Sequence, residues 1–251
     1  MNNLSNLELE ILESKYLEKF YYFLKFVEDE MLKGFQTKEG IRDQWYPFWS
    51  KNGSGDFSVG AERVVYALLN GKGIGVPNSC PVGSDLMFEV DDAFIHIDLK
   101  TVQTRNIGDF NTSIFVGENQ NSYNHFINVK SKSEVRTYKP SLPHYYNSNN
   151  VLKPCLTYFV TILYEDINLD VLNINLICMP NGQLSEIYGD KVLKAGKNTG
   201  KTRFNFSKVP NFDLLKNKKR IKTIYMNEDK VDEKYKKELK FIYDLYSNYG
   251  K

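Results

Sequence analysis

Apolar residues recur along this chain at spacings that predict helices near both ends and strands between them. From Ser5 to Lys33 they return every three or four positions, which is typical of one buried helix face, and Gly34 is a typical helix end. Similar spacing predicts a second helix over 58–70, with Ser58 as its N-cap, and a closing helix near 231–246. The first helix is defined by these apolar residues: Leu7, Ile11, Leu17, Phe20, Leu24, Val27 and Met31.

The strand patterns lie in the middle of the chain. Residues 156–164, LTYFVTILY, are almost continuously apolar or β-branched, as expected of a central strand. Residues 171–179, VLNINLICM, alternate as a strand with one polar face does, and a short helix over 184–194 and an edge strand over 203–209 follow. Residues 36–56 predict a loop. Its aromatic residues either plug the core or stack on bases: Trp45, Tyr46, Phe48 and Trp49.

Residues 84–102, SDLMFEVDDAFIHIDLKTV, read as two short strands joined by a tight turn at Asp91-Asp92. Alternation in the second strand predicts an apolar row of Ile95, Ile97 and Leu99. The opposite row is Phe94, His96, Asp98 and Lys100. An acid and a lysine beside half-buried strands need a partner, which a divalent metal bound to an anionic substrate would supply.

The order of elements predicts a mixed α/β fold around a small sheet. A length of 251 residues suits one domain over 1–251, with a helical segment at about 1–35 and a polar region at about 103–150. A polar segment of that length is usually functional, and its Asn, Gln, Arg and Lys residues are those that contact bases and phosphates. A solvated insertion is the alternative.

Composition narrows the possible partners. The net charge is only +2, so a nucleic-acid surface must be a local patch. Cys80, Cys155 and Cys178 are far apart, and no C-x-x-C pair occurs, so neither a disulfide framework nor a zinc knuckle is predicted. The polar first residues and the lack of a long apolar run predict a soluble, cytoplasmic protein with no membrane segment.

The hairpin carries the candidate chemistry. Pairing of its strands would bring Asp85 and Asp98 together, and two carboxylates suit Mg²⁺, which also keeps waters and phosphate oxygens as ligands. Lys100 would orient or deprotonate the attacking water, or stabilise the anionic transition state. The alternative is an exposed Asp98–Lys100 pair, worth under about 1 kcal/mol, on an ordinary hairpin.

Asp85, twelve intervening residues, and then Asp98-Leu99-Lys100 resemble the PD-(D/E)xK motif of the nuclease superfamily that includes type II restriction endonucleases. The resemblance implies that Asp85, Asp98 and the Leu99 carbonyl bind magnesium and that Lys100 assists the water. An acid from the preceding helix often helps in that family, and Glu62 matches it. Ser84 stands where the motif has proline (the nearest is Pro81), and Glu89 competes as a ligand.

What the resemblance implies is a restriction-endonuclease-like core, with a central mixed sheet flanked by helices. It implies a magnesium-dependent, sequence-specific endonuclease that cuts double-stranded DNA as a homodimer and is paired with a cognate DNA methyltransferase. The candidate base contacts are Gln103, Arg105, Asn106, Asn119, Gln120 and Asn121. A repair or structure-specific nuclease, and a non-catalytic DNA-binding or nucleotide-binding protein, are the alternatives.

Three other features of the sequence are candidates for a competing site. AGKNTGKT at 195–202 fits a relaxed P-loop, but it follows a helix-like segment and leads into a strand-like one, the wrong order for phosphate binding. NKKRIK at 217–222 is interpreted as a solvated basic turn. His96 is interpreted as a satisfied side chain beside the site rather than a metal ligand.

Overall fold

The structure of the chain is a computed structural model, and it describes residues 3–52, 56–70, 72–77, 83–131, 134–196, 202–206, 213–214, 218–231, 233–240, 242 and 244. The helices are α1 Asn6–Phe26, α2 Glu28–Gly40, α3 Arg42–Asn52, α4 Asp56–Leu69, α5 Gly108–Asn111, α6 Ser185–Tyr188 and α7 Glu233–Glu238. Short 3₁₀ helices are η1 Thr104–Asn106, η2 Glu118–Gln120, η3 Gly182–Leu184 and η4 Asp190–Val192. The strands are β1 Val76–Pro77, β2 Leu86–Glu89, β3 Phe94–Gln103, β4 Ser113–Val116, β5 Ile127–Ser131, β6 Glu134–Tyr138, β7 Tyr145–Ser148, β8 Val151–Tyr164, β9 Val171–Met179, β10 Leu193–Ala195, β11 Thr202–Asn205, β12 Asp213–Leu214, β13 Lys218–Lys219 and β14 Ile221–Met226.

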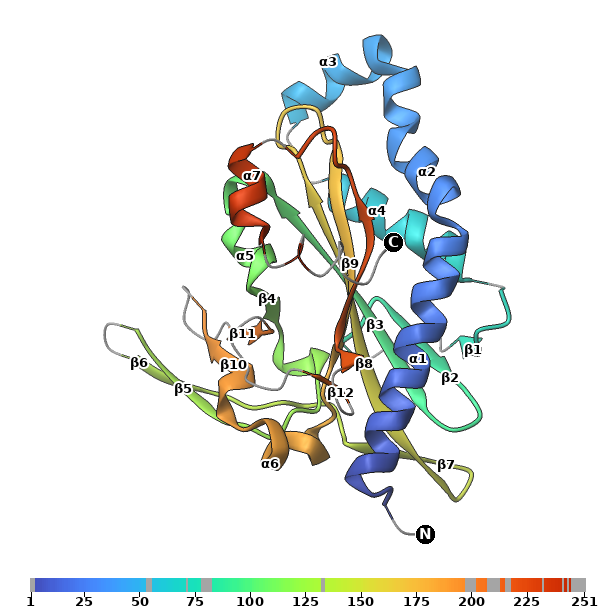
Figure 1. Cartoon of the computed structure of the whole chain (residues 1–251), viewed down its shortest axis with the longest axis vertical. Helices are drawn as coiled ribbons and strands as arrows, with labels where there is room; N and C mark the ends of the chain where they lie inside the picture. The colour runs from blue at the N-terminus through green and yellow to red at the C-terminus, as the bar shows by residue number, and fades with distance from the viewer. Residues whose placement is uncertain are drawn as a thin grey trace.

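A mixed sheet forms the centre of the molecule, in the order β1-β2-β3-β8-β9-β14, with β7 also paired to β8 (Figure 1). Strands β3 and β8 run parallel over ten residue pairs, while β2 and β9 run antiparallel to them. All of β9 is buried, and β8 is buried from Pro154 onward. The predicted mixed α/β fold with helices around a central sheet is confirmed.

Different elements cover the two faces of the sheet (Figure 1). Helix α1 lies along one face, where Phe20 packs edge-on against Tyr158 of β8 and the Tyr158 hydroxyl donates to the Glu13 carbonyl at 2.8 Å. On the other face lies a three-stranded sheet, β10-β11-β4, which brings Phe204 against Phe159. The Lys100 end of the polar row of the predicted hairpin reaches this second layer, where its ammonium lies over the ring of Phe115 in β4. Phe94 and His96, at the other end of the row, pack against Tyr146 of β7.

The N-terminal helices differ from the prediction in two ways. The helix predicted over 5–33 is two helices, because the backbone leaves helical geometry at Val27. Helical structure also continues through α3, within the segment predicted as a loop over 36–56. There Trp45 and Trp49, four residues apart, stack with ring centroids 5.2 Å apart and pack against the core. These two rings therefore match the aromatic plug rather than a base-stacking platform, whereas Tyr46 and Phe48 are exposed.

The basic run at 217–222 is a clear correction. Arg220 is fully buried, and its guanidinium pairs with the equally buried Glu13 of α1 at 2.6 Å. The ring of Tyr188 lies 4.6 Å from the guanidinium. Burial works against the charge, but the carboxylate of Glu13 together with Cys178 and Tyr188 raises the pKa of Arg220 above its ordinary value. The predicted solvated turn is wrong at this residue, because Arg220 forms an ion pair in the interior with a buried carboxylate of a distant helix.

Other segments follow the pattern with shifted ends. Strand β9 has its predicted bounds, and β8 begins five residues early at Val151. The segment predicted as a short helix over 184–194 contains the four-residue helix α6, flanked by 3₁₀ turns, and ends in strand β10. Residues 197–201 of the P-loop-like stretch lie outside the described residues, but its flanks Ala195 and Thr202 pair as an antiparallel hairpin. Cys155 and Cys178 are buried free thiols, and Cys80 is outside the described residues.

No helix in the described part of the chain is both long enough and apolar enough to cross a membrane.

Strands on both sides of residue 170 pair in the same central sheet. The division into a single domain over 1–251, with a helical segment near 1–35 and a polar DNA-contacting insertion near 103–150, stays a prediction.

Candidate active site

The two acids of the hairpin lie together at the edge of the central sheet. The turn between β2 and β3 is closed by the Val90 N–H, which donates to the Ala93 carbonyl at 2.9 Å, as the Asp91-Asp92 prediction expected. Pairing of β2 with β3 ends at Leu86 opposite Ile97. Beyond that point the Leu99 N–H donates instead to Asp85 Oδ2 at 2.7 Å. Asp85 is thus held against the strand that carries Asp98.

Asp98 is the buried acid of the site. It is only 3% exposed, and Lys100 Nζ lies 2.6 Å from its Oδ1. Burial raises the pKa of Asp98 to about 6; the Lys100 ammonium opposes this rise, and the carboxylates of Asp85 and Glu62 add to it. Lys100 therefore does not fully offset the cost of burying the Asp98 carboxylate, and an exposed ion pair on an ordinary hairpin does not describe this geometry.

Glu62 comes to the same site from helix α4, which packs on β3. Burial raises the pKa of its carboxyl, and the nearby charge of Asp85 raises it further, while the Ser58 hydroxyl and Lys100 lower it. The electrostatic influence of Asp85 and Lys100 on Glu62 means that all four predicted catalytic side chains share one neighbourhood.

His96 lies one alternation step before Asp98 and is completely buried. Its Nδ1 is 3.2 Å from the Ser84 hydroxyl and its Nε2 is 3.1 Å from the Tyr146 hydroxyl. Burial lowers its pKa to about 4, so the ring is neutral at physiological pH. Both ring nitrogens have partners, which agrees with a satisfied side chain. Through Ser84, which stands where the motif has proline, His96 also supports the residue next to Asp85.

Glu89 is not brought to the pair of acids. It ends β2 opposite Phe94, and its Oε1 accepts from Ser148 at 2.8 Å and from Lys153 Nζ at 2.9 Å. Those partners belong to the β7–β8 hairpin, at the opposite end of β2 from Asp85. This geometry argues against Glu89 as a metal ligand, because its charge already has a cation and a hydroxyl beside it.

A groove of ≈ 710 Å³ opens beside Leu99 and Lys100. Three of the predicted DNA contacts line it: Gln103, Arg105 and Asn106. Two further residues line it that the sequence analysis missed, Arg203 of β11 and Asp109, which pair at 3.0 Å. Arg203 had no signal of its own, because only the folding of β11 onto β4 brings it to this groove.

The other three predicted base contacts take different places. Asn119 is exposed, but Asn121 is fully buried, with its amide bound to the Gly117 carbonyl and the Tyr138 hydroxyl and its oxygen to the Tyr123 N–H. Asn121 therefore has no polar atom exposed to a base, and its prediction as a base contact is corrected. Gln120 points to the acids: its Nε2 donates to Asp98 Oδ2 at 2.5 Å.

The donor set at this site suits a hard cation. Two carboxylates and the Leu99 carbonyl are oxygen donors of the kind that magnesium prefers, and the pKa of Asp98, raised mainly by burial, shows that its charged form lacks full compensation. Within the described residues, no three His, Cys, Asp or Glu side chains group closely enough to hold a metal by themselves. Magnesium does not require such a group, because it keeps waters and substrate oxygens as its other ligands.

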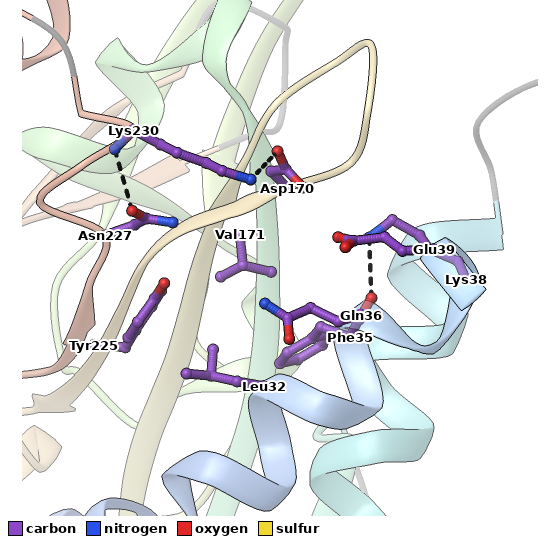
Figure 2. A pocket seen from close by; sticks show the side chains of 10 residues that line it. All are labelled: Leu32, Phe35, Gln36, Lys38, Glu39, Asp170, Val171, Tyr225, Asn227 and Lys230. Atoms are coloured by element: carbon purple, nitrogen blue, oxygen red, sulfur yellow. Dashed lines mark hydrogen bonds and ion pairs between the residues drawn. The ribbon is translucent and has the colours of Figure 1, made fainter. Parts of the chain in front are cut away.

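A second pocket lies away from the acids, between α2 and the strands β9 and β14 (Figure 2). Its volume is ≈ 20 Å³, which is room for about one water molecule. Figure 2 shows Lys230 reaching Asp170, at a distance of 2.5 Å. Its size and internal pairing make it a poor candidate for a substrate site.

Comparison with known proteins matches most of this chain to models of one family. Residues 5–168 match the model of the N-terminal domain of type II restriction enzyme MwoI, and residues 171–226 match the model of its central domain. Among solved structures, the restriction endonuclease BglI bound to its DNA recognition sequence is 16% identical with a TM-score of 0.59, covering 89% of this chain and 94% of its own. Tetrameric restriction endonuclease SfiI bound to cognate DNA is 18% identical with a TM-score of 0.67, covering 90% and 88%. At these identities the likeness shows the fold. A search of curated proteins gave no match.

Proposed function

The chain belongs to the MwoI family of type II restriction enzymes and is thus a sequence-specific DNA endonuclease, and from this premise we propose that Asp85, Asp98 and Lys100 form its catalytic centre. The observation that supports the proposal is that Asp85 is bound to the strand of Asp98, and that Asp98 pairs with Lys100, which lines an open groove. In the proposed reaction, water attacks a phosphorus atom of each strand of double-stranded DNA, and the bond to the leaving oxygen breaks.

Magnesium is the proposed cofactor. Asp85, Asp98 and the Leu99 carbonyl would hold it, and Glu62 would add negative charge nearby. When bound, the ion supplies Lewis acidity and a lowered pKa for water. The support comes from the oxygen donor set and from the raised pKa of Asp98, since a buried carboxylate beside two further acids favours a divalent cation.

Lys100 has the proposed role of orienting the attacking water and stabilising negative charge on the phosphate. Its side chain is largely buried, and its ammonium lies over the rings of Phe115 and Phe159, 5.4 and 5.8 Å from their centroids. Rings on two strands limit where the ammonium can move, so it stays beside the groove that Lys100 lines. A preorganised cation of this kind acts without reorganisation cost during the reaction.

The DNA strand would lie in the groove lined by Gln103, Arg105, Asn106 and Arg203. Arginine suits this task because its guanidinium binds phosphate oxygens or guanine edges with two parallel hydrogen bonds. Arg105 is the more available of the two arginines, since its side chain is 65% exposed and its contact with Asp166 is 3.4 Å long. A homodimer that cuts one strand per subunit, and a cognate methyltransferase, complete the proposed system.

The decisive experiment digests DNA of known sequence in the presence of Mg²⁺ and sequences the ends. We expect discrete fragments with one common end sequence, and no cleavage by Asp98→Ala, which still binds DNA. Asp91→Asn, an exposed acid in the turn of the same hairpin, is the matched control and should cut like the wild type. Cutting confined to branched or mismatched DNA would instead identify a structure-specific nuclease. Full activity of Asp98→Ala would refute the proposed centre.

A further inference from the structure

Gln120 makes contact with both charged residues of the proposed centre at once. Its Nε2 donates to Asp98 Oδ2 at 2.5 Å, and its Oε1 accepts from Lys100 Nζ at 2.9 Å. The same Oε1 accepts from the Gly117 N–H at 2.7 Å. The side chain comes from η2, 20 residues beyond Lys100 in sequence, so this bridge between acid and lysine is made by tertiary structure.

The surrounding donors and acceptors permit only one orientation of the Gln120 amide. With Oε1 toward Lys100 and Gly117, an acceptor meets two donors, and Nε2 meets a carboxylate. The flipped amide would turn its NH₂ toward an ammonium and a backbone N–H, and its oxygen toward Asp98. Every contact would then be repulsive, so the Gln120 oxygen must face Lys100 and its NH₂ group must face Asp98.

The segment that carries Gln120 is packed closely against the loop before Asp85. Gly83 has a φ of +69°, and a Cβ at this position would lie 1.6 Å from the Asn119 carbonyl oxygen. Only glycine allows this approach. On the other side of Gln120, the buried amide of Asn121 ties the chain to Gly117. The contacts of its two sequence neighbours, Asn119 and Asn121, therefore hold Gln120 in place.

We propose that Gln120 is a positioning residue of the active centre, an inference that rests on the proposed function. It fixes Oδ2 of Asp98, so that Oδ1, now paired with Lys100, is the oxygen left for the metal ion. Its Oε1 keeps the Lys100 ammonium beside the site once that pairing is exchanged for the cation. Hydrogen bonds that orient a ligating carboxylate typically contribute about 10- to 100-fold in metal affinity or activity.

The test compares Gln120→Met, which keeps the volume but removes both hydrogen bonds, with the wild type. Magnesium affinity of the free protein is measured by titration calorimetry, and DNA affinity is measured without divalent ions. We expect metal affinity and single-turnover cleavage at low Mg²⁺ to fall about 10- to 100-fold, with DNA affinity within about twofold. Gln44→Ala, an exposed glutamine on α3, is the control and should match the wild type in all three measurements.

Unchanged metal affinity with weakened DNA binding would overturn the proposal and make Gln120 a DNA contact. Unchanged behaviour in all assays would overturn it as well. Gln120→Ala is the second variant, and loss of folding by circular dichroism in both would make Gln120 a structural residue. Asp98→Ala separates failure of the positioning role from failure of the proposed catalytic centre. If Asp98→Ala is inactive while Gln120→Met behaves as wild type, only the positioning role of Gln120 fails. If Asp98→Ala is fully active, the proposed centre fails with it.

Discussion

Lowering the pH should weaken magnesium binding well before an ordinary aspartate would be protonated. Burial raises the pKa of Asp98 from 3.8 to about 6, so near pH 6 half of the molecules carry a proton on the proposed ligand. That proton must leave before the carboxylate binds a metal. The perturbation is therefore a titration from about pH 8 to about pH 5 with the metal-free protein as the starting state.

The magnitude follows from the pKa. At about pH 5, roughly one Asp98 in ten would be ionised, so the apparent affinity should be about tenfold lower than at neutral pH, or about 1.4 kcal/mol. A solvated aspartate with a pKa of about 3.9 would remain more than about 90% ionised at that pH. The two cases therefore differ about tenfold in one measurement.

The same shift predicts the stability of the metal-free protein. Because the folded pKa lies above the unfolded one, the folded state holds this proton more tightly. The stability that Asp98 contributes is present below the ordinary value of 3.8, and about 3 kcal/mol is lost as the pH rises to about 6 and above. Bound magnesium should restore part of it.

Titration calorimetry with Mg²⁺ at several pH values is the assay, and thermal unfolding with and without the ion is the second readout. Asp98→Asn, which cannot ionise, should lose this pH dependence together with most of the binding, whereas Asp91→Asn should keep both. An affinity that stays constant down to about pH 5 would refute the reasoning, since it would mean that Asp98 is ionised despite its burial.

Four further outcomes are expected. Lys100→Ala should slow single-turnover cleavage by about 10²- to 10⁴-fold with DNA binding retained; wild-type rates would contradict its role. Arg105→Ala should weaken DNA binding and reduce the salt slope by about one; an unchanged slope would remove Arg105 from the interface. Burial lowers the pKa of His96 to about 4, so the unfolded state takes up its proton first as the pH falls below about 6.5, and about 3 kcal/mol of stability is lost by about pH 4. Urea unfolding of His96→Gln should lack that loss, and an identical pH profile would contradict it. Arg220→Met leaves Glu13 buried and unpaired, so unfolding free energy should fall by about 3–5 kcal/mol in urea titrations; adding Glu13→Gln should recover part of it.

The candidate centre could be located from sequence because its main part is local. Asp85, Asp98 and Lys100 belong to one hairpin of 19 residues, and strand alternation with a short turn determines which side chains meet. The hairpin turn and the bounds of β9 were predicted for the same reason. Each depends on residues close together in the chain, where the hydrophobic pattern is sufficient.

The errors arose where distant segments decide the environment. No residue near Arg220 in the sequence indicates that its buried partner is Glu13, 207 residues away. The basic run was therefore predicted to be a solvated turn. Asn121 and Gln120 are adjacent polar residues with the same apparent suitability for DNA, yet one is buried in its own loop and the other reaches Asp98. Polar composition indicates that a segment can form hydrogen bonds but not with which partner.

The sequence by itself determined the acid pair, the lysine and the mixed sheet, because strand periodicity and the spacing of the motif are written in neighbouring residues. Only the tertiary structure decided which residues surround that centre. It paired Glu89 with Lys153, brought Glu62 of a distant helix beside Asp85, placed Gln120 against Asp98, and opened the groove toward Arg203. The physical reason is that hydrogen bonding and burial act through space, so the partner of a polar side chain is fixed only when the chain has folded.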